Sequence, residues 1–411
     1  MDAIYVVGVA MTPCGKFLDQ SVKDLTRSAV SGALADAGIE TDAIDAAFFS
    51  NAGQSAIEGQ YMIPGQVALR EAGIQGVPVA NVENACASAS TAFHLAYARL
   101  RAGLSDVVLA IGAEKLYHAD KSRSFAVFDG AWDVAHVDQV MASLDAMGRG
   151  ALPPADAIPD ATQRSAFMDV YAALTRHHMG RYGTTQRQLA AVASKNHGHS
   201  TLNPLAQYRT PFSIEEVLAA RAITWPLTLP MCAPISDGAA AAILVREDAL
   251  HRFDRRRAIR VDASILAGGT ARTIDEMDRH VCRIAARQAY EAAGIGPDDV
   301  SVAEVHDATA FGEIVQTENL GLCEPGQGGW LAESGATTLG GRVPVNPSGG
   351  LESKGHPIGA TGLGQIYELV LHLRGEAGPR QVEGARVAIA ENGGGFLGVE
   401  EAAACITILS R

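Results

Sequence analysis

This 411-residue chain lacks an excess of positive charge: 46 acidic residues outnumber 33 basic ones, and the formal net charge is −13. A surface of this sign repels nucleic acid and anionic membranes, so neither is an expected partner. The chain also lacks an uninterrupted apolar run long enough to cross a bilayer. Its start, residues 2–9, reads as a strand without the basic and apolar regions of a signal peptide.

The six cysteines lack the C-x-x-C spacing that marks zinc sites and redox motifs, and they predict no disulfide framework. Free thiols fit a reducing compartment, so a cytoplasmic location is expected. The composition is otherwise that of a globular protein, with 47% hydrophobic and 19% charged residues. This length is enough for one large or two medium domains.

A duplicated pattern sets the predicted architecture. Residues 33–50 and 289–306 both read as a helix end, a Gly-Ile pair, an acidic turn and a strand. Gly38 and Gly294 stand at equivalent helix ends, where only glycine enters the left-handed region without steric cost. Residues 93–112 and 366–391 repeat a helix, a glycine and an apolar strand. So long a period indicates a duplicated domain, and strand–helix alternation predicts parallel α/β layers.

The two halves are expected at residues 1–255 and 256–411. About residues 116–230 interrupt the first half with a proline-containing stretch at 150–154 and a polar helical stretch near 163–200. Insertions of this kind often cover a ligand site, although a decorative surface subdomain is the alternative.

Residues 346–362 place glycines and prolines around a single histidine, His356, ahead of an apolar helix pattern. Such a stretch fixes the backbone at close approach to a ligand and aims an imidazole at it. This pattern favours an enzyme over a binding scaffold. The neighbouring Lys354, one of only six lysines, is expected on the solvated surface.

Cys86 follows the strand-like residues 77–82 and precedes small residues that open a helix. The backbone N–H groups and the dipole at a helix N-terminus favour thiolate, and a nearby histidine would raise its fraction further. Cys86 is therefore the expected nucleophile. The other cysteines are expected to be structural: Cys14, Cys232, Cys282, Cys323 and Cys405.

Candidate functional residues also follow two other predicted strands. His306 follows the strand at residues 302–305, and the carboxyl ends of parallel strands face the ligand crevice. We therefore expect His306 and His356 both to point toward Cys86. Residues 391–395, Glu-Asn-Gly-Gly-Gly, follow the strand at 387–390, and their N–H groups could form half of an oxyanion hole.

At these blocks the sequence resembles the thiolase superfamily over essentially its whole length. The blocks are the Cys86 turn, residues 236–241, the GHPIGATG motif at 355–362 and the glycines at 393–395. Asn203-Pro204 and His306-Asp307 are similar to the sterol-carrier-protein type, here without its sterol-carrier domain. The resemblance implies a five-layered αβαβα fold of two duplicated halves, usually a dimer. It also implies acyl transfer between coenzyme A thioesters through an acyl-cysteine.

The resemblance assigns residue roles as well. It makes Cys86 the nucleophile, His356 the group that activates it, and His306 a donor to the thioester oxygen that His356 also helps to bind. The amides of Cys86 and Gly393 match another oxyanion hole. Gly393, Gly394 and Ser236 are expected to bind coenzyme A, which is a substrate rather than a permanent cofactor, and no metal is expected.

One catalytic group of the family is missing. One branch carries an acid/base cysteine where this chain has Glu391, and the sterol-carrier type carries it where this chain has Ala308. Glu391 is therefore the expected replacement, which would require burial to raise its pKa from about 4.3 toward about 6–7. The alternative is that Glu391 only caps a turn.

The main functional expectation is an acyltransferase that cleaves or forms a 3-oxoacyl-CoA, with a branched or aromatic substrate. One alternative is an aldolase or C-acyltransferase subunit that works with a separate, small zinc-ribbon and OB-fold protein. The other is a non-catalytic acyl-CoA or lipid-binding protein, which the missing thiol would fit. Retention of Cys86, His306 and His356 together favours the acyltransferase.

Overall fold

A computed structural model describes residues 2–154 and 166–411, so the first residues of the helical stretch predicted near 163–200 lie outside it. The strands are β1 (Ile4–Met11), β2 (Ala46–Ser50), β3 (Val79–Val82), β4 (Val107–Glu114), β5 (Ala222–Thr224), β6 (Leu227–Thr228), β7 (Gly238–Arg246), β8 (Ile259–Gly268), β9 (Val302–Glu304), β10 (Val387–Gly394) and β11 (Ala403–Ser410). The helices are α1 (Val22–Ala37), α2 (Gln54–Glu58), α3 (Pro64–Glu71), α4 (Ser88–Arg101), α5 (Lys121–Ala126), α6 (Val137–Met147), α7 (Ala166–Tyr182), α8 (Gln186–Ser200), α9 (Ile214–Ala219), α10 (Val281–Ala293), α11 (Ala310–Asn319), α12 (Gly328–Glu333) and α13 (Thr361–Arg374).

In the described chain, nine strands form one hydrogen-bonded sheet in the order β3-β2-β4-β7-β1-β8-β11-β10-β9. The strands of the two sequence halves occupy opposite sides of this order, and β1 joins β8 through Ile4, Tyr5 and Val6. The boundary predicted at residues 255 and 256 falls between β7 and β8 and stays a prediction.

The expectation of parallel layers is only partly right. The pairs β2–β3, β2–β4 and β9–β10 are parallel, whereas β1, β7, β8 and β11 pair antiparallel with their neighbours. Antiparallel strands can be joined by a short loop, as β10 and β11 are, but parallel strands need a crossover. The repeated helix–strand units therefore account only for the parallel pairs.

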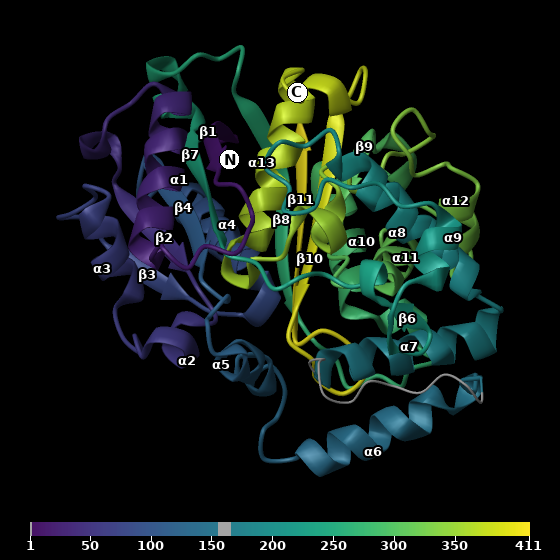
Figure 1. Ribbon diagram of the computed structural model, residues 1–411. Helices are drawn as coiled ribbons and strands as arrows, with labels where there is room; N and C mark the ends of the chain where they lie inside the picture. The colour runs from purple at the N-terminus through teal and green to yellow at the C-terminus, as the bar shows by residue number, and fades with distance from the viewer. Residues whose placement is uncertain (1, 155–165) are drawn as a thin grey trace.

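The helices lie in layers around these strands (Figure 1). Helices α1 and α3 cover the outer face of the first half, and α10 covers that of the second. Between the halves lie α4 and α13, whose apolar faces share one core with β1, β4, β7, β8, β10 and β11. The expected five-layered αβαβα fold is confirmed.

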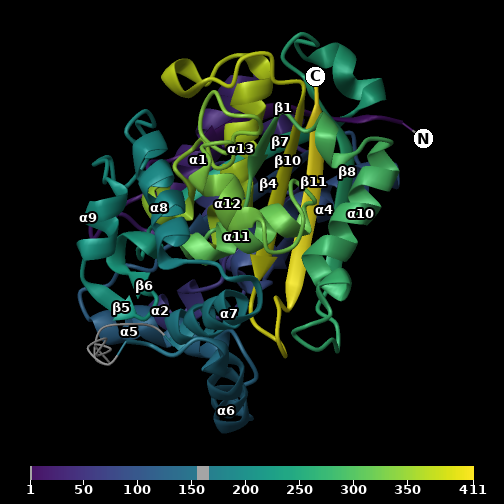
Figure 2. The ribbon, with the colours of Figure 1, turned by 90° about the vertical axis from the view of Figure 1, so that its right-hand side faces the viewer.

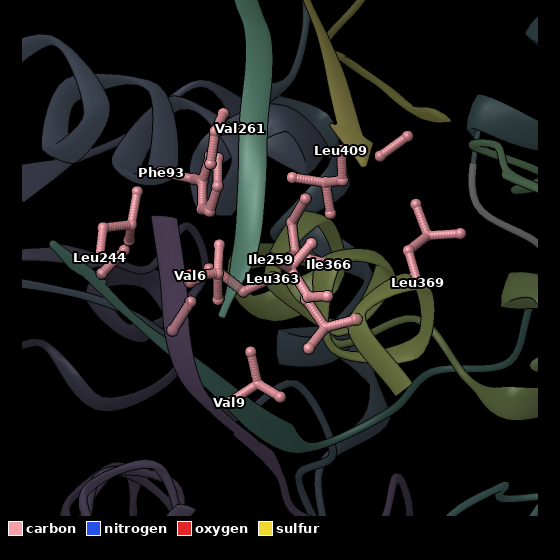
Figure 3. Close-up of a cluster of buried hydrophobic side chains, with 14 of the residues drawn as sticks. Val6, Val9, Phe93, Leu244, Ile259, Val261, Leu363, Ile366, Leu369 and Leu409 are labelled. Carbon is pink, nitrogen blue, oxygen red and sulfur yellow. The ribbon is translucent and has the colours of Figure 1, made fainter. Parts of the chain in front are cut away.

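The central layer is apolar on all sides. Phe93 of α4 and Leu363 and Ile366 of α13 pack with Val6 of β1 and Val261 of β8 (Figure 3). All five side chains are almost fully buried, as expected for helices enclosed by sheet on both sides. This packing fixes the N-termini of α4 and α13, beside which Cys86 and His356 stand.

The inserted segment crosses to the other half of the molecule. Helices α7, α8 and α9 pack through apolar side chains on α11 and α12, and α7 lies beside the loop that joins β10 to β11 (Figure 2). Phe396 of that loop packs against Val170 of α7. Among the described residues, no helix is both long and apolar enough to cross a membrane.

Candidate active site

Cys86 lies at the strand-to-helix turn between β3 and α4. The preceding Ala85 has a left-handed backbone with φ of 47°. The Ser88 hydroxyl donates to the Ala85 carbonyl at 2.6 Å, and its oxygen accepts the Asn84 N–H at 2.9 Å. These bonds hold a 3-10 turn at Ala85–Ala87, from which α4 continues. The turn presents the half-buried Cys86 thiol to a cavity.

His356 is oriented toward that thiol. Its Nε2 lies 3.3 Å from the Cys86 Sγ, and its Nδ1 lies 2.7 Å from the Thr361 Oγ1. The Thr361 hydroxyl donates its only proton to the Pro357 carbonyl at 3.1 Å, so it accepts from Nδ1–H. In this tautomer the proton is on Nδ1, and the Nε2 lone pair faces the thiol. A general base requires that arrangement.

His306 completes the cluster. Its ring centroid lies 5.2 Å from that of His356, with the ring planes at 64°. One ligand atom from each of Cys86, His306 and His356 lies within 4.8 Å of the other two. The His306 Nε2 is buried without a hydrogen-bond partner in the described chain. A buried polar atom left unpaired is costly, so this nitrogen is suited to bind a substrate oxygen.

Burial sets the resting charges of these groups. It raises the pKa of the Cys86 thiol to about 12, and Glu114 adds to this rise. Burial also lowers the pKa of His306 to about 4 and holds that of His356 well below its usual value. The resting site therefore holds a neutral thiol beside a neutral imidazole. Desolvation outweighs the helix N-terminus, so the resting thiol keeps its proton and faces the His356 Nε2.

Asp307 anchors the loop that carries His356. Its carboxylate accepts the Leu351 N–H at 2.7 Å. A β-carbon at Gly350, where φ is +62°, would collide with the same carboxylate, so only glycine fits there. The loop continues as a π-helical turn, a feature often found at functional sites. Asp307 thus couples the strand end that carries His306 to the loop that carries His356.

Lys354 corrects one expectation. It is not a surface lysine: it is 2% exposed, and its Nζ lies 3.6 Å from the Glu304 Oε2. A buried ammonium group is tolerated where a carboxylate compensates its charge, and the sequence does not reveal that partner.

Glu391 is fully buried, as its expected role requires, but its carboxylate is already engaged. It accepts the His306 N–H at 2.8 Å and lies 3.5 Å from the Cys282 thiol. Burial and Glu401 raise its pKa to about 8. Glu391 belongs to β10, which extends through Gly394, so residues 391–394 are strand rather than the predicted loop. It is not among the residues that line the Cys86 cavity. Its role as acid/base stays a prediction.

The three expected coenzyme A contacts lie in different places. Gly394 lines the Cys86 cavity and packs so closely on the Cys86 turn that a β-carbon would strike Asn84. At Gly393 a β-carbon would strike Glu401. Ser236 is buried, and its hydroxyl oxygen accepts the His356 N–H at 2.9 Å. Ser236 therefore holds the backbone at His356, and its contact with coenzyme A remains an expectation.

Two cavities meet beside the cluster. The Cys86 cavity has a volume of about 770 Å³ and includes Cys86, Ala308 and His356 in its wall. A second groove of about 670 Å³ shares Phe128, Met168 and Ala233 with it. In the part of the chain that the structure describes, four cationic side chains line the groove: Lys16, Lys121, Arg209 and Arg221. In a protein of net charge −13, this grouping favours a phosphate-bearing ligand.

Two groups of side chains in the described chain approach metal-ligand spacing. One is Cys86 with both site histidines, and the other is His280, Cys282 and Glu401. In the first group the His356 Nε2 lies 3.3 Å from the Cys86 Sγ. The expectation of no metal stays a prediction.

Sequence reasoning named Asp307 and Thr361 only within motifs, without a role, and it missed Glu114. The Glu114 carboxylate accepts the N–H groups of Ala52 at 3.0 Å and Gly359 at 3.0 Å, which ties two loops of the site together. Burial raises its pKa to about 7. A charged residue at the end of the apolar strand 107–111 was the available signal.

A Glu391→Gln substitution should change how stability depends on pH. Because the folded-state pKa of Glu391 is raised to about 8, wild type loses stability as pH rises from about 4.3, the unfolded value, toward 8. Glutamine removes this loss. Relative to wild type, the unfolding free energy of the variant should therefore increase over that range, by a few kcal/mol at about 1.4 kcal/mol per unit of pKa.

Urea unfolding between pH 5 and 8.5 measures this difference. Glu71→Gln is the control, since Glu71 is exposed at the end of α3. A stability difference that does not vary with pH would show that the Glu391 carboxyl is ionised in the folded protein.

Comparison with known proteins places this geometry in a family. The thiolase N-terminal domain model matches residues 4–219, and the thiolase C-terminal domain-like model matches residues 270–411. An acetyl-CoA acetyltransferase of Methanothermobacter thermautotrophicus is 38% identical, covering 100% of both chains. Sterol carrier protein 2 of Bos taurus is 37% identical over 95% of this chain and 69% of its own length.

A third relative, the benzoylsuccinyl-CoA thiolase subunit BbsB of Thauera aromatica, is 33% identical over 95% of this chain and 94% of its own. Among solved structures, the Ltp2-ChsH2(DUF35) aldolase has a TM-score of 0.79 at 22% identity, covering 100% of this chain and 98% of that one. Human mitochondrial 3-ketoacyl-CoA thiolase has a TM-score of 0.70 at 17% identity, with the same coverage. The chain therefore belongs to the thiolase family. It is a thiolase-type acyltransferase.

Proposed function

We propose that this enzyme cleaves or forms a 3-oxoacyl-CoA through an acyl group carried on Cys86. The observation that supports this most is the His356 Nε2 at 3.3 Å from the Cys86 Sγ, with its tautomer held by Thr361 and a cavity of about 770 Å³ in front. A nucleophile, an oriented base and room for a substrate are together what covalent acyl transfer needs.

The reaction follows from these groups. His356 takes the Cys86 proton as the sulfur adds to the 3-oxo carbon. The developing oxyanion is bound by the amides of Cys86 and Gly393, as the resemblance implies. The C2–C3 bond then breaks, which leaves an acyl-cysteine and an enolate whose thioester oxygen lies at His306 and His356. Coenzyme A finally attacks the acyl-cysteine and frees Cys86.

Thiolysis of acetoacetyl-CoA by coenzyme A tests this proposal. We expect release of acetyl-CoA together with a covalent acetyl group on the enzyme. The non-catalytic alternative, an acyl-CoA or lipid-binding protein, predicts binding without either product.

The groove lined by cationic side chains is the proposed site for the phosphates of coenzyme A. Arg209→Glu and Lys121→Glu should each raise the KM for coenzyme A by about 10-fold, since a hydrogen bond to a charged group is worth about 1.5 kcal/mol. Both residues are exposed and line the groove. The turnover number should stay close to that of wild type, because these contacts are made equally before and during the reaction.

Titration of coenzyme A in the thiolysis assay measures this effect. Arg70→Glu is the matched control, because Arg70 is an exposed arginine on α3 outside the groove. An unchanged KM in the groove variants, or an equal rise in Arg70→Glu, would contradict the assignment.

The acyl group of the substrate is proposed to be aromatic or branched. Five aromatic side chains line the Cys86 cavity, which is rich for a chain with 6% aromatic residues: Phe128, Trp132, Phe167, Tyr171 and Phe396. Trp132 and Phe167 stack at 5.3 Å. The name of one relative, benzoylsuccinyl-CoA thiolase, fits such a substrate. The kcat/KM for benzoylacetyl-CoA should therefore exceed that for acetoacetyl-CoA.

A homodimer is the proposed assembly. The strand β3 ends the sheet order with a single neighbour, β2, and an unpaired strand edge is a ready site for pairing with a second copy. Beside it lie the exposed Tyr61, Met62 and Ile63, held near β3 by a 2.7 Å bond from the Gly65 N–H to the Asn81 Oδ1. Sedimentation of wild type and of Met62→Glu tests this interface.

A cytoplasmic location is proposed from the six free cysteines. A small zinc-ribbon and OB-fold partner remains the alternative assembly. One relative is named as a thiolase subunit, and one structural neighbour is named as an aldolase together with a DUF35 protein. Co-purification from the native host, with zinc analysis of the complex, tests for that partner.

A further inference from the structure

The proposed carbon–carbon step needs a proton donor that the family's missing thiol would supply. Neither replacement position presents one to the Cys86 cavity. Ala308 lines the cavity but has no acidic proton to donate, and the Glu391 carboxylate faces the His306 N–H and the Cys282 thiol. Another group beside Cys86 must therefore be considered.

Among the described residues, few titratable side chains line the Cys86 cavity. Apart from Cys86 and His356, they are Glu83, Asp133 and Tyr171. Glu83 and Asp133 are exposed, and Asp133 is paired with His136 at 2.7 Å. Tyr171 is the group that remains in the partly buried wall.

Tyr171 stands on α7, between two cavities. It lines the Cys86 cavity and also a small back cavity of about 60 Å³ that includes His306 and Glu401 in its wall. Its hydroxyl makes no hydrogen bond to any described residue. Its ring packs in the apolar cluster that joins α7 to α8 and α11, so the side chain is held in place.

We propose that the Tyr171 hydroxyl carries out the proton transfers of the missing thiol. The inference rests on the proposed function. When the C2–C3 bond breaks, its electron pair forms the enolate, and C2 takes the Tyr171 proton to give acetyl-CoA and a phenolate. The phenolate then takes the thiol proton of the incoming coenzyme A. The resulting thiolate attacks the acyl-cysteine and releases Cys86, and Tyr171 is again protonated.

The surroundings of Tyr171 suit this cycle. Burial raises its pKa well above 10, and the nearby Cys86, Glu401, Glu391 and Asp307 raise it further. The hydroxyl is therefore protonated at rest, ready to donate to an enolate. Its phenolate is a stronger base than a thiolate of pKa about 8.5, so it can deprotonate coenzyme A. Among the residues that the structure describes, the other titratable or charged groups on the walls of the two cavities are Glu83, Asp133, His177, His178, Arg181, Tyr182, Arg272, His280, His306, His356 and Glu400.

Tyr171→Phe removes the hydroxyl and keeps the ring. Three properties of this variant are measured. Acylation of Cys86 by an activated thioester and thiolysis turnover are measured in H2O, and deuterium exchange at C2 of acetyl-CoA is measured in D2O. We expect normal acylation, because the leaving thiol of an activated ester needs no proton. Exchange and turnover should fall by about 10²–10⁴-fold, the worth of a positioned acid/base.

Tyr182→Phe is the matched control. Tyr182 lies on the same helix and lines the back cavity but not the Cys86 cavity, so its variant should behave as wild type. Incorporation of 3,5-difluorotyrosine at position 171 adds a readout that packing would not move. Its lower phenol pKa should shift the alkaline limb of the turnover profile to lower pH.

Each outcome decides the proposal. Wild-type exchange in Tyr171→Phe, or an unshifted alkaline limb, would overturn it. So would loss of exchange in Glu391→Gln with full exchange in Tyr171→Phe, which would instead confirm Glu391 as the acid/base. A wild-type protein with neither acylation nor exchange would contradict the proposed function, and the Tyr171 assignment with it.

Discussion

Replacing Cys86 with alanine will abolish the acyl-enzyme and lower 3-oxoacyl-CoA turnover by on the order of 10⁴–10⁶-fold, as losses of a catalytic nucleophile do. The whole proposed reaction passes through the sulfur, and His356, 3.3 Å away, has no other described thiol to activate. Coenzyme A should still bind with near wild-type affinity, because its proposed groove does not include Cys86. Thiolysis rates and equilibrium binding of coenzyme A measure the two effects separately.

Cys323→Ala is the matched control for Cys86→Ala. Cys323 is also half-buried, but it is not among the residues that line either large cavity. It should leave turnover unchanged. Turnover of Cys86→Ala near that of wild type would exclude acyl transfer through this residue.

The second large effect is expected at His356. His356→Ala should lower acylation of Cys86 by about 10²–10⁴-fold, the usual worth of a positioned general base. Burial raises the pKa of the Cys86 thiol to about 12, so the resting thiol depends on the neighbouring lone pair to lose its proton. The rate of iodoacetamide alkylation against pH should shift to higher pH in the variant.

His306→Ala is the informative comparison. Its Nε2 is unpaired and its ring lies edge-on to His356, which suits a donor to the substrate oxygen rather than a base for the thiol. In His306→Ala, acylation of Cys86 by an activated thioester should therefore fall far less than in His356→Ala. Equal losses in both variants would leave no separate role for the two imidazoles, and an unchanged alkylation profile in His356→Ala would make His356 a bystander.

Local patterns predicted much of the fold because they carry their own physical signal. The paired glycines Gly38 and Gly294 both adopt φ of 70° at helix ends, as the repeat requires. Whether two strands pair parallel or antiparallel could not be predicted from the residues of the strands themselves. The antiparallel pairing of β1 and β7 depends on where the long inserted segment returns the chain, and no residue in either strand encodes that.

The site shows the same division. Cys86, His306 and His356 come together as the strand ends predicted, because turns and glycine-rich loops mark them in the sequence. The residues that contact these three side chains carry no comparable signal in the sequence. Thr361 reads as an ordinary residue of its motif, although it lies five residues from His356, and Tyr171 reads as a core aromatic until distant segments bring it to the cavity.

Burial was the property hardest to predict. The helix N-terminus suggested a resting Cys86 thiolate, but desolvation raises the pKa of this thiol and reverses the expectation. For Glu391 the expected rise in pKa is found, yet the carboxylate faces His306 and Cys282. A sequence gives the ionisable group, whereas its solvation and its direction depend on the assembled layers.

The most direct test of the central claim is to locate the acyl group. The protein is incubated with acetoacetyl-CoA, quenched in acid, digested and mapped by mass spectrometry. The account predicts one acetylated peptide, the one that contains Cys86, and loss of the label when coenzyme A is added. An acetyl group on Cys232 or Cys323 with Cys86 unmodified, or turnover without any covalent adduct, would contradict it.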